Sequence, residues 1–81
     1  MEVIEVILRL DAENKVAPAS FRWQGKTLRV ESVSKRWDEE DGEHFLLMTQ
    51  PGDQVFEVLN RVSEGHWVMV KSFNDPRGKA V

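Results

Sequence analysis

Turn-forming residues divide this chain into short segments. Gly25, the pair Pro51-Gly52 and Gly65 interrupt apolar stretches at close intervals. Each stretch has the length of an ordinary strand, and consecutive strands joined by tight turns pair as antiparallel neighbours. The sequence therefore predicts an all-β fold, a small antiparallel meander or barrel of about six strands. Closure into a barrel would remove the open edges that a flat sheet exposes to aggregation.

Apolar residues occupy every second position near the amino end of the chain. They are Ile4, Val6, Leu8 and Leu10. A period of two is typical of a strand with one buried face, so we expect these four side chains to point inward.

The segment from Lys26 to Trp37 is predicted to be the longest strand. Leu28 and Val30 share one face, whereas Val33 and Trp37 fall on the other. A change of phase within one strand indicates a β-bulge, which we place near residues 31–32, or a strand bent enough to serve two sheet surfaces.

Residues 55–62 fit two secondary structures. Val55, Val58, Leu59 and Val62 also match a helical face, and Asp53 could cap such a helix. We prefer a strand, because turn residues bracket the segment on both sides and the hairpin spacing is then consistent throughout. No helix longer than about two turns is expected.

The predicted core consists of side chains that keep the same parity on neighbouring strands. They are Phe21, Trp23, Leu28, Val30, Phe56, Val58, Trp67 and Met69. The strongly acidic segment 38–43 is expected to form a solvated loop.

With 81 residues the chain suits one domain. We expect this domain to span residues 1–75, with 76–81 as a frayed tail. A chain this short buries roughly 60% of its unfolded surface, which disfavours a large internal cavity. The chain has no cysteine, so disulfides and cysteine-based zinc sites are excluded. Glu5 and Arg9 interrupt the first apolar stretch, so neither a signal peptide nor a membrane span is predicted there, and the cytoplasm is the expected location.

Residues 21–26, Phe-Arg-Trp-Gln-Gly-Lys, match the motif F-x-W-x-G-[RK]. Val30 and Val33 follow as V-x-x-V before Trp37, and the later segments 55–58 and 65–69 extend the pattern. Over residues 2–75 the chain resembles a family of small, functionally uncharacterised bacterial domains. One departure is that the acidic segment and Phe45 stand where that family usually has a pair of tryptophans. Similar domains sometimes lie next to error-prone DNA polymerase-like modules, so the resemblance implies a link to DNA metabolism without specifying an activity.

Positive charge is concentrated in residues 22–37, although the formal net charge of the chain is −3. Six residues of this segment are the candidate interaction site: Lys35, Arg36, Trp37, Arg22, Lys26 and Arg29. Residues 35–37, at the end of the predicted strand, combine two cations with an aromatic ring, a mixture that favours recognition of a binding partner. Arg22, Lys26 and Arg29 are expected on the outward face of one hairpin. A solvated strand face is the plainer interpretation of that hairpin, given the acidic segment beside it.

Trp37 has two possible roles. It is either an exposed recognition anchor or a plug that closes the end of the barrel, and its position favours the plug. Trp23 and Trp67 are expected in the core.

No catalytic, cofactor or metal site is predicted. The acidic segment lacks the D-x-D-x-D-G spacing of calcium loops, and His44 and His66 have no third ligand at a recognised spacing. Both histidines lie beside turns and are expected to be exposed. No serine has a nucleophile-elbow context, and no phosphate-binding glycine loop is present.

The sequence therefore favours a non-enzymatic module that binds a partner protein. The alternative is a barrel that binds single-stranded nucleic acid through the basic hairpin and Trp37.

Overall fold

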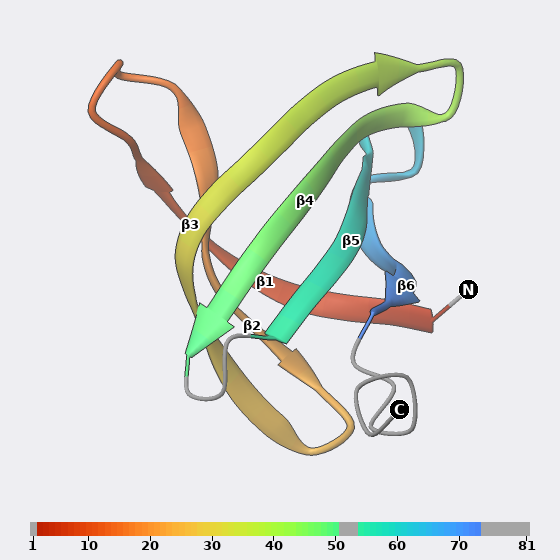
Figure 1. Ribbon diagram of the computed structural model, residues 1–81. Helices are drawn as coiled ribbons and strands as arrows, with labels where there is room; N and C mark the ends of the chain where they lie inside the picture. Colours follow the sequence, from red (N-terminus) through yellow and green to blue (C-terminus); the bar gives the residue numbers. More distant parts are fainter. Residues whose placement is uncertain (1, 51–53, 74–81) are drawn as a thin grey trace.

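Each strand of this protein pairs with the strands before and after it in the sequence. The computed structural model describes residues 2–50 and 54–73. Its strands are β1 (Glu2–Leu10), β2 (Val16–Trp23), β3 (Lys26–Glu39), β4 (Gly42–Gln50), β5 (Gln54–Arg61) and β6 (His66–Ser72). The first and last strands also pair antiparallel, so the meander closes into the barrel drawn in Figure 1. The predicted all-β fold is confirmed.

Residues 54–61 form strand β5, as preferred over the helix. The helical segment in the described residues is a single 3-10 turn, Val62–Glu64, which ends at Gly65 with φ 72°. Nowhere in residues 2–50 and 54–73 is there a helix with the length and apolar character needed to cross a membrane. The predicted turn at Pro51-Gly52 and the predicted frayed tail 76–81 lie outside the described residues.

Strand β3 is bent by two irregularities in its pairing with β4. The register shifts between Val30 and Ser32, which confirms the bulge predicted there, and again between Val33 and Lys35. The ladder between β2 and β3 reaches only to the pair of Ser20 and Arg29. The bulges let β3 curve away from β2 while it stays paired with β4 from Arg29 to Glu39 (Figure 1).

The core is centred on Phe56, which is fully buried. Its ring meets Phe21 and Trp23 in edge-to-face contacts, with centroid distances of 5.3 and 5.1 Å. Five of the predicted core residues are buried as expected: Phe21, Leu28, Phe56, Val58 and Met69.

The predicted core residues Trp23, Val30 and Trp67 take part in the core but are only partly buried. All three are half-buried and pack against the edge of the core cluster. Trp23 ends β2 beside a turn and Trp67 lies next to the start of β6, so each indole packs on a core phenylalanine, Phe56 and Phe45 respectively, at the margin of the core. Complete burial of so large a side chain is uncommon in a small domain.

The inward face predicted for β1 holds only at its amino end. Ile4 is buried and Val6 half-buried, but Leu8 and Leu10 are 44% and 59% exposed. A register shift follows Ile7 in the pairing with β2. Beyond that shift the β1–β2 hairpin extends away from the barrel in Figure 1. Ala17, opposite Arg9, is only 4% exposed, whereas Leu8 and Leu10 lie on the other face of the hairpin and remain exposed.

The acidic segment is not the loop that the sequence predicted. Strand β3 continues to Glu39 and β4 begins at Gly42, so Glu40 and Asp41 alone form the turn. Asp38 is paired with Glu43 in the ladder. Acidic residues have a low propensity for strands, but the pairing of the two long strands outweighs it and fixes most of these residues in the sheet.

Candidate functional site

The predicted corner of Lys35, Arg36 and Trp37 is divided between the two faces of β3. The Lys35 ammonium lies 5.4 Å from the centre of the Trp37 ring. Arg36 points the other way, with its guanidinium 4.6 Å from the centre of the Phe45 ring. Because neighbouring side chains alternate across a sheet, these residues cannot act as one surface.

Arg36 is engaged in internal contacts from three directions. Its Nε donates a 2.9 Å hydrogen bond to Glu43, and its Nη2 donates a 3.0 Å hydrogen bond to the carbonyl oxygen of Val16. Its Nη1 lies 3.9 Å from Asp11. Arg36 therefore ties the β1–β2 hairpin to β3 and β4, a structural role that its sequence context did not reveal.

The basic residues of the β2–β3 hairpin also separate. Arg22 lies opposite Thr27 and donates a 3.0 Å hydrogen bond to its hydroxyl, while Lys26 lies opposite Trp23. Directly opposed residues share a face. The expectation that Lys26 joins Arg22 and Arg29 on one outward face is therefore wrong, although all three side chains are exposed.

A different group of polar side chains meets where β3 turns into β4. His44 is only 5% exposed, which contradicts the expectation of an exposed histidine. Its Nδ1 lies 2.8 Å from Glu57 Oε2 on β5, and its Nε2 lies 2.8 Å from Asp41 Oδ1. Glu39 Oε1 is 3.7 Å from the same Nε2. We call these four residues the His44 cluster.

Trp37 covers this cluster. Its ring stacks on the imidazole of His44 at a centroid distance of 5.3 Å and an angle of 14°. Its Nε1 donates a 2.6 Å hydrogen bond to Glu39 Oε2. Trp37 is half-buried and lies outside the core cluster and the residues packed against it, so it is neither a free anchor nor a core plug.

The ionisable groups of the His44 cluster shift one another's pKa values. Burial lowers the pKa of His44, but hydrogen bonds to Asp41 and Glu57 outweigh it, and the pKa is raised above its usual value of 6.5. The hydrogen bond from His44 lowers the pKa of Asp41. Both ring nitrogens of His44 contact carboxylate oxygens, and ionised carboxylates only accept hydrogen bonds, so this arrangement favours the protonated imidazole.

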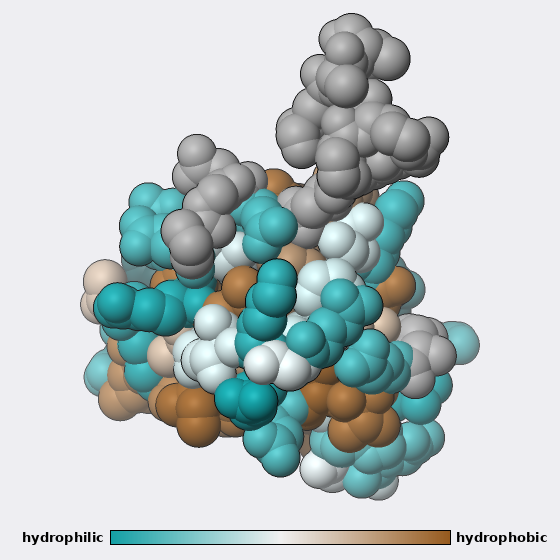
Figure 2. Space-filling model, turned by 90° about the horizontal axis from the view of Figure 1, so that it is seen from below, coloured by the Kyte–Doolittle hydropathy of each residue, from teal (hydrophilic) through white to brown (hydrophobic). Residues whose placement is uncertain are grey.

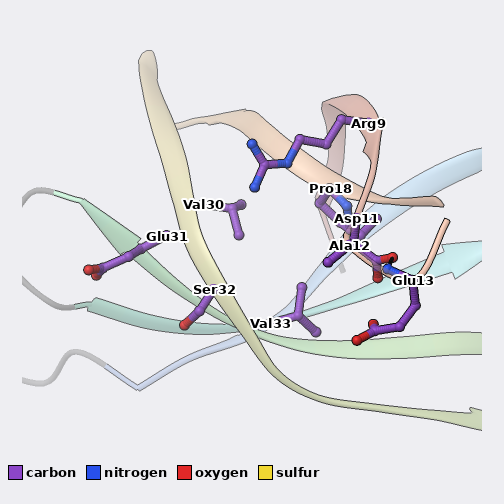
Figure 3. Close-up of a pocket in the computed structure, with 10 residues that line it drawn as sticks. Arg9, Asp11, Ala12, Glu13, Pro18, Val30, Glu31, Ser32 and Val33 are labelled. Carbon is purple, nitrogen blue, oxygen red and sulfur yellow. Dashed lines mark hydrogen bonds between the residues drawn. The ribbon is translucent and has the colours of Figure 1, made fainter. Parts of the chain in front are cut away.

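A cleft opens where β3 leaves β2. Its volume is about 230 Å³. Its apolar lining residues are Ala12, Ala17, Pro18, Val30 and Val33, and its polar ones are Arg9, Asp11, Glu13, Glu31 and Ser32. Figure 3 shows Val30 and Val33 pointing from β3 toward the β1–β2 hairpin, whereas Glu31 points to the other side of the strand. Arg9 reaches into the same space from β1.

Exposed aliphatic residues gather on the hairpin that borders this cleft. Leu8 is 44%, Leu10 59% and Val16 50% exposed. Leu10 lies directly opposite Val16. We call these three residues the hairpin patch. The face drawn in Figure 2 is mostly hydrophilic, and apolar residues reach that face only in separate patches.

The sequence interpretation missed the His44 cluster because it treated the acidic segment and the histidines separately. A two-residue turn at Glu40-Asp41 would have placed Trp37 opposite His44, as the ladder shows. The glycine at position 42 was the sequence signal for that turn. In the structure its φ is 138°. Glu57 comes from β5 and could not have been assigned without the barrel register. No protein-family model matches the chain, and searches of curated proteins and of solved structures find no match.

Proposed function

We propose that this domain is a non-catalytic protein-binding module that holds an extended, apolar segment of a partner protein at the hairpin patch and the adjoining cleft. The observation that carries the proposal is the grouping of three exposed aliphatic side chains on one hairpin, which also borders a cleft of mixed polar and apolar lining. Exposed aliphatic residues next to one another are a common mark of a protein interface.

The backbone around the cleft supports an extended ligand. The β2–β3 ladder stops at the pair of Ser20 and Arg29, so the two strands continue on either side of the cleft without a common ladder. Pro18 lies on this side of β2, and proline in a sheet is typical of an edge. An added strand binds through backbone hydrogen bonds and places alternate side chains in apolar pockets.

A protein partner is supported better than a nucleic acid. One face of the Trp37 ring is covered by His44, which leaves less of it for base stacking. Arg36 is engaged by Glu43 and by the hairpin, and Lys26 is separated from Arg22. The formal net charge of −3 also opposes attraction to phosphate.

The test uses a phage-displayed library of random twelve-residue peptides selected against the immobilised domain. We expect the selected peptides to carry alternating apolar residues and to shift the amide resonances of residues 16, 17, 19 and 30–35. Leu10→Thr and Val16→Thr preserve strand propensity and should each weaken peptide binding at least about tenfold. The control is Val62→Thr, which alters an aliphatic residue that is 71% exposed and lies outside the patch.

Three results would overturn this proposal. Peptides that bind Leu10→Thr and the unaltered domain equally would show that the patch is not the site. Self-association in sedimentation experiments that Leu10→Thr abolishes would show that a second copy occupies the patch. In parallel, salt-sensitive binding of an oligothymidylate, with no peptide selected, would assign the domain to single-stranded nucleic acid instead.

A further inference from the structure

We propose that Glu39, Asp41 and His44 bind a divalent transition-metal ion of the zinc type at the turn between β3 and β4. The three residues offer one carboxylate oxygen each from Glu39 and Asp41 and the Nε2 atom of His44. These atoms all lie within 4.8 Å of one another. The inference is independent of the protein-binding function proposed above.

The spacing of the three atoms suits a small tetrahedral ion. Zinc bonds of 2.0–2.1 Å require ligand atoms roughly 3.3 Å apart. The observed separations from His44 Nε2 are 2.8 Å to Asp41 Oδ1 and 3.7 Å to Glu39 Oε1, which bracket that value. The carboxylate oxygens of Asp41 and Glu39 lie within 4.8 Å of each other, so side-chain shifts of at most about 1.5 Å would complete the three-ligand set.

Neighbouring residues already orient two of the ligands. Glu57 holds His44 Nδ1 at 2.8 Å, which leaves Nε2 directed toward Asp41 and Glu39. A metal-binding histidine almost always donates its other ring N–H to a carboxylate or another acceptor in this way. The Trp37 Nε1 donates to Glu39 Oε2 and leaves Oε1 on the side of His44. A purely solvated acidic turn would not require either arrangement.

The charge of the cluster favours a cation. Three carboxylates surround one imidazole, and His44 is nearly inaccessible to water. On binding, the ion would take the place of the proton on Nε2, while the Nδ1–H continues to donate to Glu57. One imidazole nitrogen with two carboxylates suits zinc better than calcium or magnesium, which prefer oxygen ligands only. Three protein ligands leave a fourth position for water or for a group of a bound partner.

The second histidine provides a matched comparison. His66 Nε2 lies 3.3 Å from Glu64, but His66 is half-exposed and does not belong to the cluster that can hold an ion. Adventitious binding to any histidine beside a carboxylate would therefore affect both sites. Specific binding should affect only His44.

The experiment is calorimetric titration of the domain with zinc chloride near pH 8, accompanied by NMR of the imidazole nitrogens. We expect saturation at about one ion per chain and a shift of the His44 Nε2 resonance. Glu39→Gln and Asp41→Asn change exposed side chains and should each weaken binding at least about tenfold. Glu57→Gln should weaken binding by about tenfold or more through loss of the group that orients His44.

The control variant His66→Gln should bind zinc as the unaltered domain does. The proposal is overturned if no saturable binding at one ion per chain is found, or if Glu39→Gln and Asp41→Asn bind unchanged. Loss of binding in His66→Gln would assign the ion to the other histidine. Circular dichroism of each variant establishes that it is folded, so weakened binding in a folded Glu39→Gln protein supports the site directly.

Discussion

Trp37 on β3 and His44 on β4 lie directly opposite each other in the ladder, with their rings stacked 5.3 Å apart. The sequence analysis placed Trp37 in the candidate interaction site but predicted no site at His44. Trp37 shields one face of the imidazole and orients Glu39 through its Nε1. The contact therefore assigns Trp37 a positioning role in the His44 cluster.

Trp37→Ala should destabilise the domain by about 2 kcal/mol, because it removes a half-buried aromatic stack. Trp37→Phe keeps an aromatic ring but removes the Nε1 donor, so it should cost less, about 1 kcal/mol. Urea unfolding measures both. An alanine variant with unchanged stability would show that the stack contributes nothing. A loss as large as that of a central core residue would restore the role of a barrel plug.

Phe56→Ala should cost about 3–5 kcal/mol, because Phe56 is fully buried and contacts Phe21 and Trp23. That is a large part of the stability of a domain of this size. Phe73→Ala is the control, since Phe73 is 46% exposed, and it should cost under about 1 kcal/mol. The free energies of unfolding are compared by chemical denaturation, provided that the two variants show the same dependence on denaturant concentration. Equal losses in the two variants would contradict the position of the core.

Gly42→Ala should unfold the domain or destabilise it by about 3 kcal/mol or more. A Cβ atom at this position would overlap the backbone carbonyl of Asn60, and φ is 138°, where other residues are strained. Gly25→Ala is the matched control. Its φ is also positive, at 78°, but no atom lies near the added Cβ, so about 1 kcal/mol is expected. Thermal melts that rank the two variants in the reverse order would contradict this packing.

The stability of the domain should depend on pH through Asp11. The backbone N–H groups of Lys15 and Glu13 donate to its carboxylate, and together with Arg36 they lower the pKa of Asp11 below its usual value of 3.8. A carboxyl group with a lowered folded-state pKa stabilises the fold above its unfolded-state pKa. This contribution is lost as the pH falls through the lower, folded-state value.

Asp11→Asn cannot ionise and therefore serves as the comparison. The unaltered domain should exceed it in stability above about pH 5, and the difference should shrink toward acid pH. Carbon-13 NMR of the Asp11 carboxyl group checks the same point, with a midpoint expected below 3.8. A midpoint above that value would show that the loop hydrogen bonds do not form in solution.

The sequence alone determined the fold class and the order of the strands. Alternating apolar residues and regularly placed turn residues act locally, so they predict strands and hairpins without knowledge of distant contacts. The bulge near residue 31 was predictable for the same reason, because a change of phase is visible along one strand. Strand β5 was predictable because turn-forming residues bracket it in the sequence.

The positions of the functional side chains were decided by the tertiary structure. The register of the closed barrel brings Glu57 to His44, thirteen positions away in the sequence. The same register buries His44 and commits Arg36 to Val16, twenty positions away. These contacts depend on how the strands of the barrel align, which no local pattern specifies.

The exposure of Leu8 and Leu10 also separates what the local sequence predicts from what the tertiary structure decides. Their alternation correctly predicted a strand, but burial requires a second layer opposite the strand. The β1–β2 hairpin extends away from the barrel, and the face that carries Leu8 and Leu10 is exposed, whereas Ala17 on the opposite face is buried. Local pattern determines the conformation of a segment, whereas the assembled sheet determines what each side chain faces, because burial is a property of all the strands together.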